Sequence, residues 1–227
     1  MNMKGGVGKT TVCMHLAGAL GYYKYRRSRK ILAIDYDPQF NLSQAYISPT
    51  KYFSLEKSRK TTLSVLVDDD TDLDPFDIQL PGSHTPPAVS ALAHTVYSFA
   101  GGFGLDIVPS TLDLMYLALG QTDLKTAPME ERFEKLISEA RGLYDVVLID
   151  CHPAGSLFTK TSLRNSDHVL IPVAPTSSYA VRGIGLMMNF VSSKKVGNAG
   201  PKPHILFNSQ AEWAFPRKKL AFEMPKT

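Results

Sequence analysis

The chain has 227 residues, of which 44% are hydrophobic, 20% charged and 10% aromatic, and its formal net charge is +4. This composition is typical of one large globular domain with a buried core, and it excludes intrinsic disorder as a general description. The small positive charge permits binding to a polyanion without indicating it.

The cysteine content and the hydropathy pattern favour a protein of the reducing cytosol. Only Cys13 and Cys151 occur, without a Cys-x-x-Cys pair, so we expect neither a disulfide framework nor a zinc ribbon. The sequence lacks the run of about 18 apolar residues that spans a membrane, and MNMKGGVGKTT at its start lacks the apolar segment of a secretory signal. We therefore expect a cytoplasmic protein with no membrane anchor.

Helical and strand-like patterns alternate along the chain. The first pattern is helical, because Val12, Leu16 and Ala19 share one face of residues 10–20. Short apolar runs then predict strands at 31–35, 145–150, 168–174 and 204–207. Helical patterns separate them at 129–140, 156–165 and 181–191. Strands that are apolar throughout and alternate with helices predict an α/β fold, with a mostly parallel twisted sheet and helices on both faces.

The stretch 48–103 is less regular than the rest of the chain. It contains a short helical pattern at 62–68, then six aspartates within 68–77, then the segment PGSHTPP. The aspartate spacing does not fit a calcium loop, because no Gly and closing Glu fall in register. We interpret this stretch as a solvated, linker-like insertion over one end of the sheet rather than as an acidic metal site.

The sequence KGGVGKTT at residues 4–11 predicts a phosphate-binding loop that leads into the first helix. Glycines let the backbone wrap around a di- or triphosphate, and the helix N-terminus adds partial positive charge. Lys9 can reach the β- and γ-phosphates, and the Thr10 hydroxyl can ligate Mg²⁺. A glycine-rich turn that caps a helix would explain the glycines but not the Lys9-Thr10 pair. The expected phosphate-binding residues are Lys4, Gly5, Gly6, Val7, Gly8, Lys9, Thr10 and Thr11.

A second lysine distinguishes this loop from the ordinary P-loop. The ordinary pattern requires Gly where this chain has Met3, and it does not need Lys4. With Lys4 five residues before Lys9, the loop resembles that of the ParA/MinD family of deviant Walker A P-loop ATPases, most closely the ParA-type partition proteins. The resemblance implies ATP and Mg²⁺ as cofactors and catalytic roles for Lys4 and Lys9. It also implies a homodimer formed on ATP, in which Lys4 reaches the nucleotide of the partner.

Residues DYDPQFNLSQ (35–44) resemble the first switch segment of that family, D-x-D-P-Q-x-N. A carboxylate that ends a parallel strand lies at the edge of the sheet where phosphates bind, and there it can hold a Mg²⁺-bound water or polarise the attacking water. The resemblance implies that Asp37 orients the hydrolytic water and that Asp35 supports the metal shell. A strand-terminating Asx turn would explain the same residues without catalysis.

Residues 144–156 resemble the Walker B strand and second switch segment of the family. Asp150 ends a predicted buried strand, where an unpaired carboxylate would be costly, and Mg²⁺ with its water shell is the natural partner. His152 replaces the usual proline, and we assign it no catalytic role. Asn208 resembles the asparagine that reads adenine after a late strand.

Both ends of the chain depart from the family pattern. Family members have an apolar first strand before the loop, whereas three residues precede Lys4, and the chain ends soon after Asn208. We therefore expect one ATPase domain over residues 1–227 whose first strand and C-terminal end are incomplete. A missing central strand would leave the backbone hydrogen-bonding groups of its neighbours unpaired.

The resemblance implies an ATPase that acts in plasmid or chromosome partition. ATP would close the dimer, the dimer would bind DNA without sequence preference, and a centromere-bound ParB-like activator would stimulate hydrolysis. Two basic stretches, 24–30 and 216–219, could contact DNA, although a solvated charged surface is the simpler explanation of each. Such a protein would be cytoplasmic and associated with the nucleoid.

A MinD-like ATPase that positions the division site or a cargo at a membrane is the main alternative. Such proteins end in a basic amphipathic helix, but the last ten residues carry only Leu220, Phe222 and Met224 as an apolar set. An iron–sulfur electron carrier needs cysteines at cluster positions, which Cys13 and Cys151 do not match. A metabolic P-loop ligase or synthetase would not need Lys4.

Overall fold

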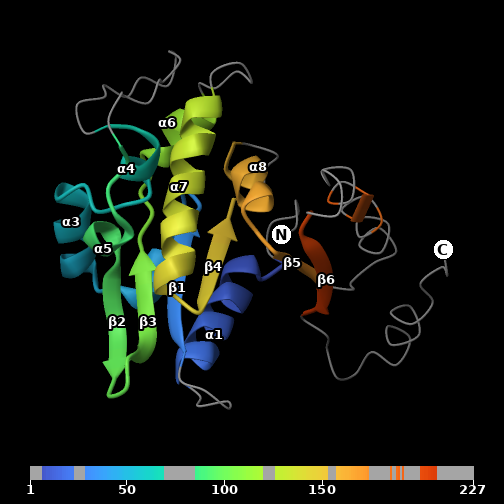
Figure 1. Cartoon of the computed structure of the whole chain (residues 1–227), viewed down its shortest axis with the longest axis horizontal. Coiled ribbons are helices and arrows are strands. Elements are labelled where there is room, and N and C mark those ends of the chain that lie inside the picture. Colours follow the sequence, from blue (N-terminus) through green and yellow to red (C-terminus); the bar gives the residue numbers. More distant parts are fainter. Residues whose placement is uncertain are drawn as a thin grey trace. The chain divides into compact units, whose positions relative to one another are not determined.

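The computed structural model describes residues 7–22, 29–68, 85–119, 126–152, 157–173, 185, 188–189, 191 and 200–208. The chain divides into two compact units. The larger unit is Thr10–Asn165, and the smaller unit combines Met1–Lys9 with Ser166–Thr227. Each unit has its own sheet (Figure 1).

A four-stranded sheet forms the centre of the larger unit, in the order β2-β3-β1-β4. Its strands are β1 (Lys30–Tyr36), β2 (His94–Phe99), β3 (Phe103–Val108) and β4 (Val146–Cys151). β1 runs parallel to both β3 and β4, and β2 forms an antiparallel pair with β3. The mostly parallel sheet confirms the predicted fold class.

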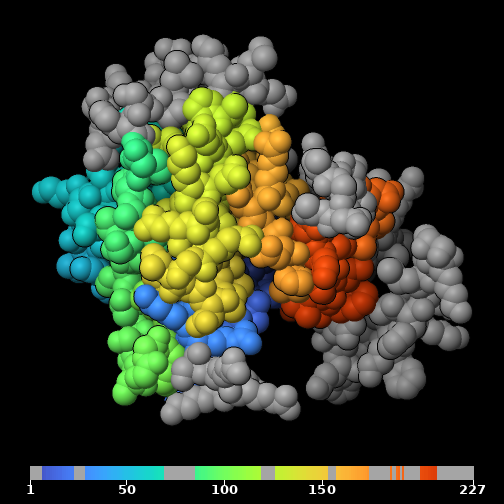
Figure 2. Space-filling model, viewed as in Figure 1, coloured from blue at the N-terminus to red at the C-terminus, as the bar shows by residue number. Residues whose placement is uncertain are grey.

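Helices cover both faces of this sheet. They are α1 (Lys9–Tyr22), α2 (Asn41–Tyr46), α3 (Pro49–Lys57), α4 (Leu63–Leu66), α5 (Val89–Leu92), α6 (Leu114–Leu119), α7 (Ala127–Leu143) and α8 (Leu157–Arg164). Side chains of β1 alternate between two buried clusters, as the period of a strand requires. Leu32, Ile34 and Tyr36 pack with α4–α8, whereas Ile31 and Ala33 pack with α1–α3. In the space-filling view α7, in yellow, covers the centre of one face (Figure 2).

The interpretation of residues 48–103 as a solvated insertion is wrong for the part that the structure describes. This part forms α3, α4, α5, the edge strand β2 and the start of β3. Leu66 and Val89 are fully buried in the core, and Leu63 and Leu92 are almost so. The short helix predicted within 62–68 is present as α4, whereas α5, with four residues and no such pattern, was not predicted. Residues 69–84, which hold most of the aspartates, lie outside the described residues.

Helix α7 has the predicted amphipathic pattern and extends beyond the predicted range. Met129, Phe133, Leu136 and Ala140 are buried at helical spacing. The buried Arg132 forms an ion pair with Asp68, with Nη1 and Oδ1 2.9 Å apart, and its Nε donates to the carbonyl of Val65 at 2.8 Å. Asp68, the first of the aspartates, therefore fixes the segment after α4 against α7.

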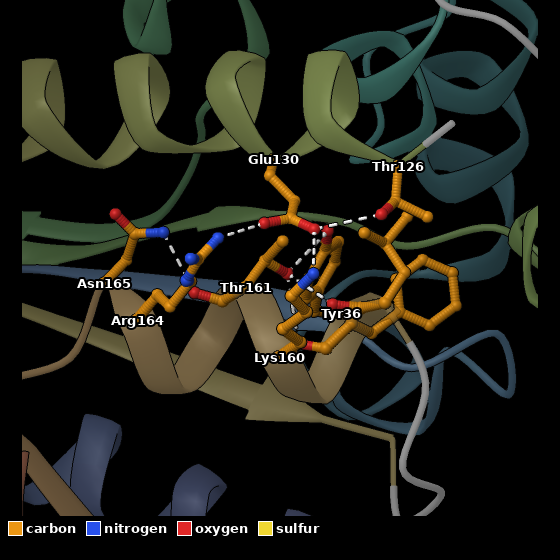
Figure 3. A network of polar contacts seen from close by, with 9 residues as sticks. Tyr36, Thr126, Glu130, Lys160, Thr161, Arg164 and Asn165 are labelled. Carbon is orange, nitrogen blue, oxygen red and sulfur yellow. Dashed lines mark hydrogen bonds and ion pairs between the residues drawn. The ribbon is translucent and has the colours of Figure 1, made fainter. Parts of the chain in front are cut away.

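Glu130 joins the start of α7 to α8 (Figure 3). Its carboxylate accepts hydrogen bonds from Thr126 Oγ1 at 3.0 Å and Lys160 Nζ at 2.6 Å, and it forms an ion pair with Arg164. Burial by itself would raise the pKa of Glu130, but the hydrogen bonds from Lys160 and Thr126 and the charges of Lys160 and Arg164 hold it below its ordinary value. The ionised carboxylate is therefore the form that holds α8 in place.

The smaller unit contains a two-stranded parallel sheet of β5 (His168–Val173) and β6 (Lys202–Phe207). Both strands were predicted from their apolar runs, and both are present. The helix predicted over 181–191 lies mostly outside the described residues.

Candidate functional site

Two acidic residues meet at the carboxyl end of the sheet in the larger unit. β1 and β4 are parallel neighbours, and their register pairs Asp35 directly with Asp150. Asp35 is fully buried and Asp150 is 4% exposed. Two buried carboxylates side by side are oxygen ligands of the kind that Mg²⁺ prefers, and their mutual repulsion would be relieved by a cation. The residues predicted for the metal shell on these two strands are thus brought together.

Hydrogen bonds from α2 hold the carboxyl group of Asp35. Its Oδ2 accepts from the backbone N of Ser43 at 2.8 Å and from Ser43 Oγ at 2.6 Å, and its Oδ1 accepts from the backbone N of Asp37 at 3.3 Å. Burial raises the pKa of Asp35 to about 7 despite the lowering effect of these bonds, and the charge of Asp150 contributes to the rise. Asp35 therefore connects the end of β1 to the segment that carries Asp37.

Asp37 lies in a tight turn between β1 and α2. Its Oδ1 accepts from the backbone N of Gln39 at 3.0 Å, and its carbonyl accepts from the backbone N of Phe40 at 2.9 Å. Phe40 adopts a left-handed φ of 42° and stacks on Tyr52 with ring centroids 5.1 Å apart. The Asx turn considered from the sequence is therefore present. Asp37 is 7% exposed at the same end of β1 as Asp35, and its role in orienting water stays a prediction.

The first turn of α1 contains the next part of the motif. Gly8 has a φ of 82°, which favours glycine, and α1 begins at the following residue, Lys9. Thr10 is half-buried and Thr11 is exposed in the first turn, where backbone N–H groups have no partner within the helix. The structure confirms the predicted succession of glycine, lysine and helix.

Cys13 of α1 lies close enough to Asp35 and Asp150 to be affected by their charges. Burial raises the pKa of this thiol well above its ordinary value, and the charges of Asp150, Asp35 and Cys151 raise it further. Such a thiol stays protonated at neutral pH and is a poor nucleophile. We therefore assign Cys13 a packing role beside the candidate site.

In the smaller unit, Asn208 contacts the phosphate loop. Its Nδ2 donates to the carbonyl of Val7 at 3.1 Å, and its backbone N donates to the carbonyl of Val173 at 2.8 Å. Val7 itself is buried, at 3% exposed. Asn208 thus connects the ends of β5 and β6 to the loop, and the reading of adenine by this residue stays a prediction.

Two buried serines of the site were missed from the sequence. Ser43 Oγ accepts from the backbone N of Ser110 at 3.0 Å, and Ser110 Oγ donates to the carbonyl of Asp37 at 2.7 Å. Both serines are fully buried. Serine has no distinctive signal in sequence, and Ser110 lies 73 residues from Asp37, so only the folded chain reveals the contact.

Several predicted residues cannot be placed. Lys4, Gly5, Gly6, the basic stretch 216–219 and residues 24–28 of the first basic stretch lie outside the described residues. The carbonyl of His152 accepts from Thr159 Oγ1 at 3.2 Å, which is a structural contact. Within the described part of the chain, no helix is both long and apolar enough to cross a membrane.

Comparison with known proteins identifies relatives of this chain. The model of the family AAA_31, described as an AAA domain, matches residues 1–199. The sporulation initiation inhibitor protein Soj of Bacillus subtilis is 32% identical over 193 residues, which cover 84% of this chain and 62% of Soj. The chromosome partitioning protein ParA of Caulobacter vibrioides is 30% identical over 207 residues, which cover 90% of this chain and 64% of ParA. The chain thus spans somewhat less than two thirds of these two relatives.

Solved structures share the fold at lower identity. A plasmid partition protein from Borrelia burgdorferi matches 98% of this chain and 81% of its own, at 21% identity and a TM-score of 0.67. The structure of pNOB8 ParA bound to nonspecific DNA matches 97% of this chain and 72% of its own, at 20% identity and a TM-score of 0.67. A cobyrinic acid a,c-diamide synthase from Mycobacterium smegmatis, with bound ATP analogue and magnesium, matches 99% and 76%, at 20% identity and a TM-score of 0.70.

Proposed function

This chain belongs to the ParA/MinD family of P-loop ATPases, and on that premise we propose that it is a ParA-type partition ATPase. In this proposal the protein binds ATP with Mg²⁺, dimerises on ATP and binds DNA without sequence preference. A ParB-like activator stimulates hydrolysis, which returns the protein to the free state. It thereby moves a plasmid or chromosome within the cytoplasm, in association with the nucleoid.

The observation that carries the proposal is the register of Asp35 with Asp150 at the carboxyl ends of β1 and β4. A pair of buried carboxylates is costly unless a cation offsets their charge. We assign Asp150 and the Thr10 hydroxyl to Mg²⁺ and its waters, and Asp35 to the surrounding shell. When bound, Mg²⁺ would supply positive charge against the phosphates.

The remaining roles follow from the loop and the first switch segment. The N–H groups of Gly5, Gly6, Val7 and Gly8 would bind phosphate oxygens, together with those of Thr10 and Thr11. Lys9 would neutralise the β- and γ-phosphates, and Lys4 would reach the nucleotide of the partner. Asp37, buried except for 7% of its surface, would accept a hydrogen bond from the attacking water and orient it. Asn208 would read adenine in addition to its contact with Val7.

The relatives support the biological role. Soj and ParA are at least 30% identical to this chain over most of its length, and ParA is named a chromosome partitioning protein. The pNOB8 ParA structure holds nonspecific DNA. Because the synthase of Mycobacterium smegmatis has the same fold, DNA binding is the property that separates partition from a metabolic reaction.

Retention on nonspecific duplex DNA tests the proposal directly. The protein is applied to immobilised DNA with ATP, ADP or no nucleotide across a salt series. We expect retention with ATP alone, and it should weaken as salt rises because phosphate contacts release counterions. Lys9→Ala is the matched negative control, since it removes the phosphate contact. Equal retention in all three nucleotide states, or none in any, would contradict the partition role.

A further inference from the structure

We propose that Ser110 is a positioning residue that fixes the turn carrying Asp37, so that the segment after β3 sets the geometry of the hydrolytic site. The inference rests on the proposed ATPase function, because it assigns Asp37 to the attacking water. Ser110 lies outside every motif of the phosphate site and contacts the turn from the segment after β3. We call the contacts of Ser110 with Asp37, Ser43 and Tyr52 the Ser110 brace.

All three polar groups of Ser110 are engaged with the segments around Asp37. Its Oγ donates to the carbonyl of Asp37 at 2.7 Å. Its backbone N donates to Ser43 Oγ at 3.0 Å, and its carbonyl lies 3.1 Å from the hydroxyl of Tyr52. Ser110 is fully buried, so water does not replace these partners without rearrangement.

The direction of the hydrogen bonds connects Ser110 to Asp35. Ser43 Oγ has one proton, which it donates to Asp35 Oδ2 at 2.6 Å, so towards the backbone N of Ser110 it acts as acceptor. The Ser110 brace is therefore connected to the carbonyl of Asp37 directly and to the carboxyl group of Asp35 through Ser43.

Helix α3 supports the brace from the outside. The hydroxyl of Tyr52 also lies 3.0 Å from Glu56 Oε1, and Thr111 Oγ1 donates to the same oxygen at 2.8 Å. Glu56 therefore holds the residue after Ser110 as well as the tyrosine that contacts it. Tyr52 of α3 also stacks on Phe40, so α3 contacts both the segment after β3 and the turn after β1.

Loss of the Ser110 hydroxyl should change catalysis more than binding. The carbonyl of Asp37 would keep its bond from the backbone N of Phe40 but lose the one from Ser110. The turn could then shift while the phosphate loop, which belongs to other segments, keeps its nucleotide contacts. Displacements of about 1 Å in a catalytic group can lower a rate by as much as roughly 100-fold.

The test compares Ser110→Ala with Ser64→Ala in the full chain. Ser64 is also buried and its Oγ also donates to a carbonyl, that of Arg59, but it lies in α4. We expect Ser110→Ala to lower kcat for ATP hydrolysis about 10-fold with KM changed less than about 2-fold. Ser64→Ala should lose comparable stability with kcat unchanged, and Ser110→Thr, which keeps a hydroxyl, should recover much of the rate. Equal kcat in the two alanine variants overturns the proposal.

Hydrogen exchange separates failure of the brace from failure of the proposed function. We expect Ser110→Ala to accelerate exchange of the amides of Gln39 and Phe40, whose acceptors are both on Asp37, whereas Ser64→Ala leaves them unchanged. Tyr52→Phe, which removes one hydroxyl, should produce the same effects at smaller size if Ser110→Ala does not fold. A wild-type chain without ATPase activity would overturn the function, and unchanged exchange in Ser110→Ala would overturn the brace.

Discussion

At Asp35, burial and hydrogen bonding act on one carboxyl group in opposite directions. Burial raises its pKa to about 7, above the ordinary value of 3.8, although the two bonds from Ser43 lower it. The folded state therefore binds this proton more tightly than the unfolded chain does. Its contribution to stability is fully present below about pH 4 and is lost as the pH rises through about 7.

Asp35→Asn should remove this pH dependence. In the absence of Mg²⁺ and nucleotide, we expect the free energy of unfolding of the variant to rise relative to wild type as the pH increases from 5 to 8. Asparagine carries no charge, and its side-chain oxygen can still accept from Ser43. Urea unfolding at each pH measures the difference. Parallel stability curves for the two proteins would show that Asp35 is already ionised in the folded state at pH 5, so that its pKa is not raised.

Asp37→Ala should separate nucleotide binding from hydrolysis. We expect kcat to fall roughly 100-fold, within the range of general acid–base contributions, with ATP affinity nearly unchanged. Asp113→Ala, at an exposed position after β3, is the control and should hydrolyse ATP normally. Steady-state turnover and equilibrium nucleotide binding provide the two readings. Normal turnover in Asp37→Ala would mean that another group orients the water.

At the level of elements, α7 and α8 are held together by charge as well as by apolar packing. Glu130 is mostly buried, at 11% side-chain exposure, and it is bonded to Lys160 and Arg164 of α8. The pKa of Glu130 is lowered in the folded state, whereas the pKa of Asp35 is raised. The stability that Glu130 supplies is therefore present above its unfolded pKa near 4.5 and is lost as the pH falls through the folded value.

Glu130→Gln should destabilise the protein at neutral pH and have little effect in acid. We expect a loss of about 1–2 kcal/mol at pH 7, because both cationic partners are partly exposed and solvent weakens the pairs. The matched control is Glu131→Gln, whose partner Lys135 is one turn away and where both side chains are more than half exposed. That control should cost at most about 0.5 kcal/mol. Chemical unfolding at pH 7 and at a pH below the lowered folded pKa distinguishes the two, and an equal loss at both pH values would contradict a charge effect.

At the level of the whole molecule, the proposed function includes a second copy of the chain. The membership in the ParA/MinD family rests on a match over residues 1–199 and on relatives that are longer than this chain. Dimerisation on ATP is part of the proposal because Lys4, the lysine added to the ordinary loop pattern, would act on the partner's nucleotide. The role of Lys4 can therefore be tested by the oligomeric state.

Lys4→Ala should bind ATP as a monomer. We expect nucleotide affinity within a few-fold of wild type, because Lys9 remains, and loss of the ATP-dependent increase in mass by light scattering. Lys60→Ala, an exposed lysine after α3, controls for the loss of one positive charge and should dimerise normally. A dimer that persists in Lys4→Ala would refute the action of this lysine across the interface.

The elements with strong local patterns were predictable from the sequence. The strands β1, β4, β5 and β6 appear as apolar runs, α7 shows helical spacing, and Gly8 with Lys9 marks the start of α1. Because parallel strands end at the same edge of a sheet, the placement of Asp35 and Asp150 at that edge also followed from their positions, whereas their direct pairing is seen only in the register. These features depend on neighbours in the chain or on a general rule of α/β folds.

Other features were decided by the tertiary structure alone. The hydroxyl of Ser110 meets the carbonyl of Asp37 across 73 residues, and the amide of Asn208 meets Val7 across 201. The four-residue helices α4 and α5 in 48–103 are buried only because other elements cover them. A hydrogen bond to a distant backbone carbonyl leaves no periodic trace in the sequence, since a carbonyl is present at every position. The local pattern therefore determined the strongly patterned elements and the start of α1, whereas long-range packing decided which side chains hold the acidic residues in place.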